Sequence, residues 1–121
     1  MYRKRCRHWI GLALIAYLAC GNVRAGFVDG HALRELLAAS TRVDQGREVP
    51  GDYQASAEGI GYIKGVFDAY SRAELLCAPR SMRAGQAMAI VEKFLNENPE
   101  TWTMPATILV LTALKEPFAC K

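Results

Sequence analysis

The sequence predicts an all-α protein, a small four-helix domain closed by one disulfide. Apolar residues recur at steps of three and four in four segments, which is the period of an amphipathic helix. No segment shows the sustained alternation of apolar and polar residues that indicates a strand. Stretches containing proline or glycine separate the four segments, as turns and loops do.

The first two helices are predicted on either side of a loop. The first runs from Phe27 to Arg42, with Asp29 as its cap, and has Leu33, Leu36, Leu37 and Ser40 along one side. Residues 43–51 contain two glycines and a proline and form the loop. Asp52 can cap the second helix, which runs to about Arg72. Its predicted shared face holds Tyr53, Ala57, Ile60, Ile63, Phe67 and Tyr70.

The second helix also carries small residues one turn apart, namely Ala57, Gly61 and Gly65. A glycine inside a helix costs roughly 1 kcal/mol relative to alanine. We therefore expect another helix backbone to approach closely here. Packing in the core is the preferred interpretation, and a contact between two copies of the chain is the alternative.

The third and fourth helices follow two proline-containing joints. Residues 74–80 interrupt the pattern, after which Ser81 can cap a helix that runs to about Asn96. Its predicted buried stripe is Ala84, Ala87, Met88, Val91, Phe94 and Leu95. Residues 96–100 form a polar turn. Pro105 suits the first turn of the fourth helix and Pro117 ends it. Its apolar residues include Ile108, Leu109, Leu111 and Leu114, with Thr112 among them.

Residues 1–25 have the features of a secretory signal peptide. Residues 2–8 carry four cations and no acid, and the next eleven residues are uncharged. A membrane-spanning helix needs roughly 20 apolar residues, so this run is too short for one. Cleavage is predicted before Gly26, which leaves residues 26–121 as the folded domain in the periplasm. Alternatively, lipoprotein processing would make Cys20 the first residue and anchor the protein to the membrane.

Removal of the signal peptide changes the net charge of the chain. Ten Lys and Arg then face twelve Asp and Glu, so the net charge is about −2, although the whole chain carries +3. Binding to nucleic acid depends on clustered Lys and Arg. Nucleic acid is therefore not expected as a partner.

Two cysteines, Cys77 and Cys120, remain in the predicted mature chain. An even number of cysteines in an oxidising compartment favours a disulfide. Closing this loop would contribute about 4 kcal/mol by restricting the unfolded chain. Two buried free thiols or half of a metal site are the alternatives.

Residue patterns typical of catalysis are not found in this sequence. His31 is the single histidine of the mature chain, and the two cysteines lack the C-x-x-C spacing of redox and zinc sites. The acids are scattered, and Asp68 is expected to pair with Lys64 or Arg72 on its helix. No catalytic residue, metal or cofactor is predicted, and the protein is not expected to be an enzyme.

Five short motifs occur in order between residues 52 and 121. They are Gly61-Tyr62-Ile63-Lys64-Gly65-Val66-Phe67-Asp68, Cys77-Ala78-Pro79, Val91-Glu92-Lys93-Phe94-Leu95 before Asn98-Pro99-Glu100, Ala113-Leu114, and Phe118-Ala119-Cys120. Together they resemble the Rap/Tai immunity-protein family of type VI secretion. The residues that carry the resemblance are Gly61, Tyr62, Gly65, Asp68, Pro79, Leu95 and Pro99.

The resemblance implies an all-helical periplasmic protein, often a homodimer, that binds a secreted peptidoglycan-cleaving amidase toxin and blocks its active-site cleft. It also matches Cys77 and Cys120 to the closing disulfide of the family. Family members commonly carry a second cysteine pair. The corresponding places, around residues 37–40 and at Gly59, hold apolar or small residues here.

Two joints between helices are predicted to contact the partner. The candidates are Arg47 and Glu48 in the first joint, and Glu97, Asn98, Glu100 and Trp102 in the third. As alternatives, Trp102 covers the end of the fourth helix as a core residue, and the glutamates belong to a solvated turn. The alternative function is a periplasmic structural or chaperone-like helical module without a toxin partner.

Overall fold

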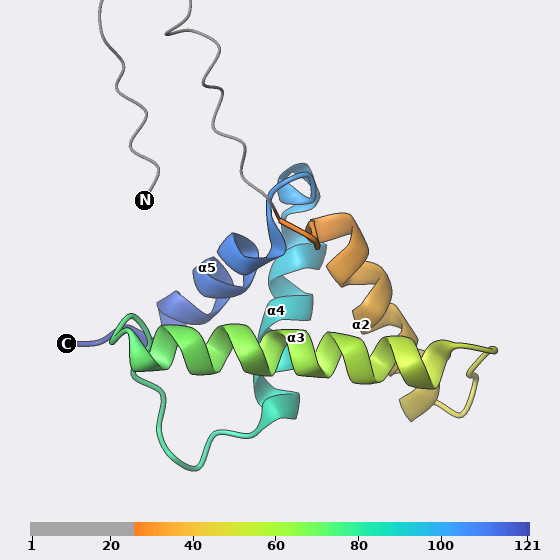
Figure 1. Ribbon diagram of the computed structural model, residues 1–121, viewed down its shortest axis with the longest axis horizontal. Coiled ribbons are helices and arrows are strands. Elements are labelled where there is room, and N and C mark those ends of the chain that lie inside the picture. The colour runs from red at the N-terminus through yellow and green to blue at the C-terminus, as the bar shows by residue number, and fades with distance from the viewer. Residues whose placement is uncertain (1–25) are drawn as a thin grey trace, which may run out of the picture.

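The computed structural model describes residues 26–121, and the fold of this part is all-α, as predicted. Its helices are α2 (Gly30–Asp44), α3 (Asp52–Arg72), α4 (Ala84–Glu97), the 3-10 helix η1 (Pro99–Thr101) and α5 (Ala106–Phe118). The long helix α3 runs across one side of the molecule, and α2, α4 and α5 lie behind it in the view of Figure 1. The predicted signal peptide and Cys20 lie outside the described residues. Within residues 26–121, no helix is both long enough and apolar enough to cross a membrane.

Local hydrogen bonds explain where α2 and α4 begin. The Asp29 carboxylate accepts a hydrogen bond from the Ala32 N–H at 2.9 Å, which confirms the predicted cap of α2. Ser81 does not cap α4, because a turn closed by the Met82 N–H and the Pro79 carbonyl (3.0 Å) occupies this stretch. Helix α4 therefore starts two residues later than predicted, with Arg83 rather than Ser81 at the cap position.

Helices α3 and α5 lie close to their predicted ranges but differ at their termini. α3 ends at Arg72 as predicted but begins one residue earlier, because Gly51, with a φ of 95°, takes the cap position expected for Asp52. Helix α5 starts after Pro105 and runs one residue past Pro117. Proline lacks the N–H that would continue the helical hydrogen bonds, and α5 accordingly ends at Phe118, directly after Pro117.

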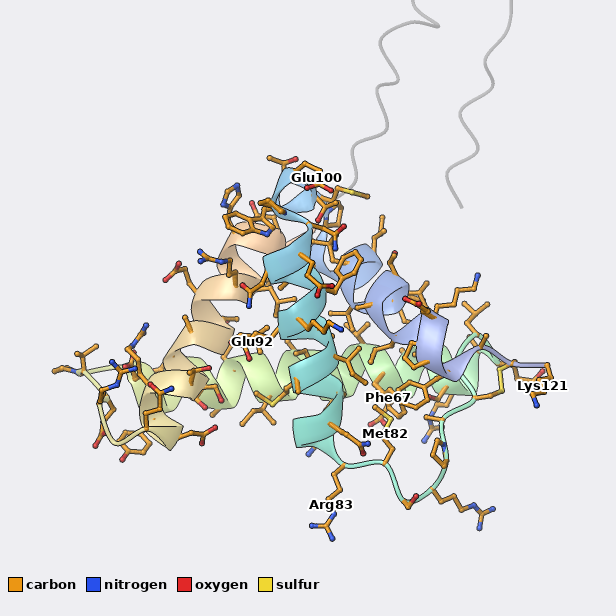
Figure 2. The ribbon with its side chains drawn as sticks, turned by 180° about the vertical axis from the view of Figure 1, so that it is seen from behind. Phe67, Met82, Arg83, Glu92, Glu100 and Lys121 are labelled. Atoms are coloured by element: carbon orange, nitrogen blue, oxygen red, sulfur yellow. A yellow bond between two sulfur atoms is a disulfide. The ribbon has the colours of Figure 1, made fainter. Side chains whose placement is uncertain are left out.

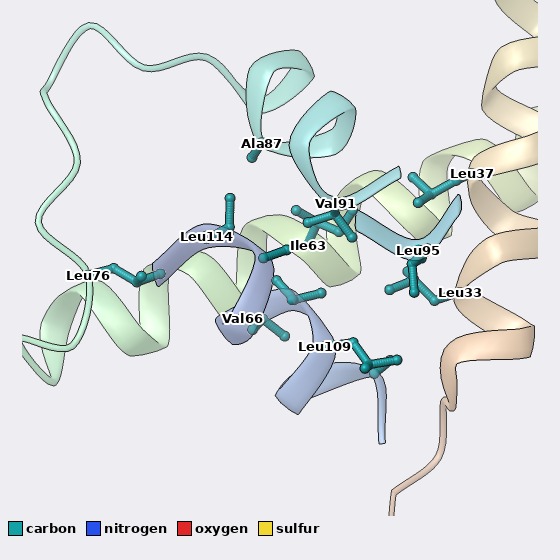
Figure 3. Packing of buried hydrophobic residues seen from close by; sticks show 13 residues of the cluster. Leu33, Leu37, Ile63, Val66, Leu76, Ala87, Val91, Leu95, Leu109 and Leu114 are labelled. Carbon is teal, nitrogen blue, oxygen red and sulfur yellow. The ribbon is translucent and has the colours of Figure 1, made fainter. Parts of the chain in front are cut away.

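All four helices contribute to a single hydrophobic core (Figure 3). Its fully buried side chains are Leu33, Ile63, Val91, Leu95, Leu109, Val110 and Leu114. Burying one side chain of this size stabilises a fold by about 1.5–3 kcal/mol. The stripe predicted for α4 agrees with this core, whereas Thr112 on α5 is exposed.

The buried face of α3 differs from the predicted one. It consists of Asp52, Ser56, Gly59, Ile63 and Val66. Tyr53 is 65% exposed, and Ala57 is also exposed. The expected core packing of Gly61 and Gly65 is wrong, since a Cβ at either position would meet nothing within 4 Å. The close approach occurs at Gly59, where a Cβ would lie 3.0 Å from the Leu36 Cβ.

The start of α2 is tied to the connection between η1 and α5. The Gly30 N–H donates to the Met104 carbonyl at 3.0 Å, and the His31 N–H donates to the Trp102 carbonyl at 3.1 Å. The Ala106 N–H donates back to the Val28 carbonyl at 2.9 Å. Gly30 fits tightly, because a Cβ there would lie 2.6 Å from the Trp102 Cα. This contact fixes α2 relative to α5.

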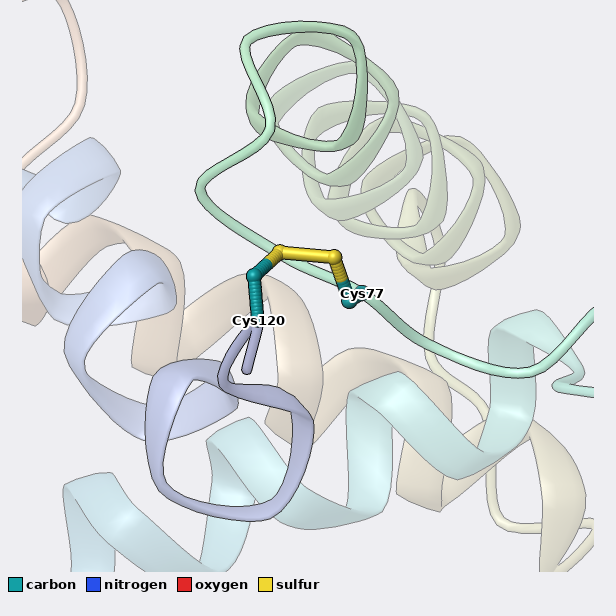
Figure 4. Close-up of a disulfide and its surroundings, with 2 residues drawn as sticks. All are labelled: Cys77 and Cys120. Atoms are coloured by element: carbon teal, nitrogen blue, oxygen red, sulfur yellow. A yellow bond between two sulfur atoms is a disulfide. The ribbon is translucent and has the colours of Figure 1, made fainter.

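The predicted disulfide between Cys77 and Cys120 is confirmed (Figure 4). The two Cα atoms are 4.9 Å apart. Beside the disulfide, the Cys77 N–H donates to the Phe118 carbonyl at 2.8 Å. The bond thus joins the end of α5 to the segment that follows α3.

Candidate partner-binding site

The six residues predicted to contact a partner lie in two patches at opposite ends of α2. Arg47 and Glu48 belong to the 45–51 loop, which follows α2 (Figure 1). The other four belong to the η1 corner, defined as residues 97–102, where Glu100 is labelled in Figure 2. A 15-residue helix is about 22 Å long, so α2 separates the patches by about this distance. The structure therefore does not bring all six residues together.

The 45–51 loop protrudes from the end of the molecule (Figure 1), and all seven of its residues are exposed. Gly46 and Gly51 have φ values of 63° and 95°, a region that side chains other than glycine rarely adopt. These two glycines allow the chain to turn tightly between α2 and α3.

Asp52 holds the base of the loop from the first turn of α3. Its carboxylate accepts hydrogen bonds from Nε and Nη2 of Arg42, each at 2.7 Å. It also accepts the Val49 N–H at 2.9 Å. The hydrogen bonds from Arg42 and then from Val49 lower the pKa of Asp52 to about 2. Because Asp52 is only 4% exposed, this bidentate pair fixes both ends of the loop to the domain.

The outer surface of the loop combines charged and apolar groups. Val49 is 53% exposed and Tyr53, directly after the loop, is 65% exposed. The Tyr53 hydroxyl donates to Glu48 Oε1 at 3.2 Å, and this bond raises the pKa of Tyr53. Exposed tyrosine is common among the residues that dominate protein interfaces. Tyr53 was not predicted as a surface residue, because its spacing from Ile60 and Ile63 placed it on the predicted buried face.

Trp102 in the η1 corner is largely engaged by the rest of the fold. Its Nε1–H donates to the Leu95 carbonyl at 2.8 Å and so satisfies the end of α4. The Arg34 guanidinium lies 4.3 Å from the centre of the indole ring, and the His31 ring meets it edge-on at 5.5 Å. These contacts favour the structural interpretation of Trp102.

The other predicted residues of the η1 corner differ in how far they are available to a partner. The Asn98 side chain donates to the Phe94 carbonyl at 2.7 Å and is half-buried. Glu97 is exposed, and its Oε1 lies 3.8 Å from the Lys93 Nζ. An exposed ion pair of this kind contributes little to stability. Glu100 is also exposed. Only the two glutamates thus present side chains that a partner could contact directly.

The residues that carry the family resemblance are spread over several parts of the fold and do not form one site. Leu95 is buried in the core, Tyr62 is half-buried against it, and Pro99 starts η1. Burial raises the pKa of Tyr62. Pro79 is in the turn before α4, while Gly61, Gly65 and Asp68 are exposed on α3. Within residues 26–121, Asp68 forms no ion pair with the expected Lys64 or Arg72.

The described residues contain no group of three or more His, Cys, Asp and Glu side chains that could hold a metal ion.

A family model described as Rap1a immunity proteins matches residues 29–120 of the sequence. No curated protein matches it. Because the family model covers nearly the whole described domain, with all four helices and both disulfide cysteines, the chain belongs to the family of Rap1a immunity proteins.

Proposed function

We propose that the protein is a periplasmic immunity protein without catalytic activity, which binds a peptidoglycan-amidase effector of type VI secretion and blocks its active-site cleft. Membership of the Rap1a immunity family supports the binding of an effector toxin. The amidase as target comes from the resemblance of the motifs between residues 52 and 121.

The observation that carries this proposal is the exposed and firmly based 45–51 loop. A convex loop can enter a concave active site, which usually lies in a cleft. Arg42 and Asp52, which flank the loop, restrain its two ends through hydrogen bonds of 2.7 Å. Less conformational entropy is then lost on binding than for a flexible loop, which favours a tight complex. The mechanism is steric occlusion, in which the loop occupies the space that the substrate needs.

Two features support the periplasm as the place of action. Disulfides persist in oxidising compartments such as the bacterial periplasm, and Cys77 is bonded to Cys120. The predicted signal peptide over residues 1–25 would direct the chain there. Mass spectrometry of the exported protein tests both. We expect a chain that starts at Gly26 and lacks two hydrogens, whereas a lipid attached to Cys20 would indicate membrane anchoring.

Titration calorimetry with the purified amidase effector encoded beside the gene tests the function. We expect a complex of defined stoichiometry with a nanomolar dissociation constant. The loop variant Arg47→Ala/Glu48→Ala/Tyr53→Ala should weaken it at least tenfold, because it removes the exposed loop side chains but keeps Asp52. The variant Glu97→Ala/Glu100→Ala tests the other candidate surface, the η1 corner, and should bind like the wild type if the loop alone forms the main contact.

Each contrary result has a distinct meaning. If the wild-type protein binds no amidase effector, the immunity function is wrong, and the chaperone-like alternative gains support. If only the η1 variant weakens the complex, the function stands but the interface lies at the other end of α2. The homodimer implied by the resemblance is a separate prediction, which sedimentation equilibrium would test by showing twice the chain mass.

A further inference from the structure

A groove runs between α2 and α4 on the side of the molecule seen in Figure 2. The two helices are closest near the η1 corner and diverge toward the start of α4, while α3 crosses behind them. A hollow of about 360 Å³ lies at the divergent end. A second hollow of about 100 Å³ adjoins it toward the η1 corner, since Leu37 and Glu92 line both. Ligand-binding clefts begin at about 300 Å³, so the larger hollow alone reaches this size.

The floor of the larger hollow is apolar, and its edge on α4 consists of residues with small side chains. Leu37, Ile60 and Met88, from three different helices, line it. Methionine adapts its shape readily to an incoming group. Gly85 and Ala89 lie at the exposed edge, and a Cβ added at Gly85 would meet nothing within 4 Å. Another chain could therefore approach the α4 backbone closely and place a large side chain on this floor.

The charged residues lining the larger hollow, Asp44 and Glu92, are both acidic. Glu92 lies between α4 and α2 in Figure 2 and accepts a hydrogen bond from the Thr41 hydroxyl at 3.2 Å. Within residues 26–121, neither carboxylate has a cationic partner within 4 Å. By contrast, the hollow between α3 and α4 is lined by charges of both signs, including Lys64 and Arg83. The larger hollow, at the divergent end of the α2–α4 groove, thus favours a cationic occupant, whereas the smaller hollow is lined by Arg34 as well as Glu92.

We propose that the α2–α4 groove is a second docking surface for the effector, and that it accepts a large apolar side chain flanked by Lys or Arg. This inference rests on the proposed function and names a chemistry that the partner must present. The groove is continuous with the first surface, because Asp44 ends α2 and the 45–51 loop starts at the next residue. A partner that covers the loop would also reach the groove. The two carboxylates select for positive charge, and the floor supplies the apolar contact.

Two matched peptides test the chemistry of the groove without the effector. One is a twelve-residue amphipathic helix of leucine, alanine and lysine, and the other has glutamate in place of each lysine. We expect the lysine peptide to shift the methyl resonances of Met88 and Ile60, and the glutamate peptide to leave them unchanged. The variant Asp44→Asn/Glu92→Gln should weaken binding of the lysine peptide at least tenfold. The control Glu58→Gln/Glu116→Gln removes two exposed carboxylates outside the groove and should bind as the wild type does.

The inference is wrong if the lysine peptide leaves both methyl groups unshifted, or if the glutamate peptide binds equally well. A titration of the amidase effector into Ala89→Arg separates the groove from the loop. Ala89 is exposed on α4, so the variant should have the melting temperature of the wild type. The positive charge of the new arginine should repel the Lys or Arg side chains of the partner. We expect at least tenfold weaker binding. Wild-type affinity for Ala89→Arg, with weak binding by the loop variant, would refute the groove and leave the immunity function intact. If the effector binds no variant and not the wild type, the function itself fails, and the peptide titration alone decides the groove.

Discussion

Replacing Gly30 by alanine should destabilise the protein, although alanine is the better helix former. The added Cβ would lie 2.6 Å from the Trp102 Cα and 2.7 Å from the Trp102 carbonyl oxygen. Ordinary contacts begin at 3.4 Å, so the backbone must move by up to 0.8 Å. Two hydrogen bonds that tie α2 to residues 102–104, from the Gly30 and His31 N–H groups, lie within the part that must shift.

The expected size of the effect follows from three contributions. Overpacking a fitted site costs about 1–3 kcal/mol. Weakening one of the two hydrogen bonds adds about 1 kcal/mol. The gain in helix propensity from alanine offsets up to about 1 kcal/mol. Gly30→Ala should therefore lower the free energy of unfolding by about 1–3 kcal/mol. For a domain of this size, each 1 kcal/mol corresponds to a change of about 4–8 °C in the melting temperature.

Urea unfolding followed by circular dichroism at 222 nm, with the disulfide intact, measures this change. Gly65→Ala is the matched control, because Gly65 is inside α3, is exposed and has open space at the Cβ position. It should raise the free energy of unfolding by about 0.5–1 kcal/mol. Equal or greater stability of Gly30→Ala relative to Gly65→Ala would refute the close contact between the start of α2 and Trp102.

Three further predictions concern the contacts that hold the loop, the chain end and the η1 corner. The pKa of Asp52 is about 2 in the fold, below its ordinary value of 3.8, so its contribution to stability is present above pH 4 and is lost as the pH falls toward 2. The difference between the wild-type and Asp52→Asn melting temperatures should therefore shrink across this interval, and a constant difference would contradict it. Replacing both Cys77 and Cys120 by alanine should lower the free energy of unfolding by about 2–5 kcal/mol, measured in urea; an unchanged midpoint would show that the disulfide does not stabilise the fold. Trp102→Phe removes the hydrogen bond from Nε1–H to the Leu95 carbonyl and should lower the free energy of unfolding, measured in urea, by about 1–3 kcal/mol. A free energy of unfolding equal to that of the wild type would mean that this bond contributes nothing to stability.

The four helices could be predicted because their core positions carry large apolar side chains at helical spacing. Leu33 and Leu37 on α2, and Val91 and Leu95 on α4, repeat at steps of four and are all buried. The disulfide followed from the number of cysteines after the predicted signal peptide. These inferences rest on local spacing and composition, which a single sequence contains.

The orientation of α3 could not be obtained in the same way. Its buried face includes Ser56 and Gly59, which give no apolar signal, whereas Tyr53 and Ala57 were expected inside and are exposed. A helix with apolar residues on two sides does not indicate which side faces the core. The neighbouring helices decide this, and Gly59 packs against Leu36 because no side chain intervenes.

The candidate site was only partly accessible to sequence analysis. Glycine and proline in residues 43–51 predicted a loop, and Arg47 and Glu48 were correctly placed on it. The protrusion of the loop and its attachment by Arg42 and Asp52 depend on the angle between α2 and α3, which no local pattern specifies. The groove between α2 and α4 likewise joins residues 44 and 92, which are far apart in the sequence.

Peptidoglycan hydrolysis by the purified amidase effector, followed while the protein is added in increasing amounts, tests the central claim most directly. We predict that hydrolysis stops when about one equivalent of wild-type protein has been added for each binding site on the effector. The loop variant Arg47→Ala/Glu48→Ala/Tyr53→Ala should need at least ten times more. Undiminished hydrolysis in the presence of excess wild-type protein would contradict steric occlusion by the 45–51 loop.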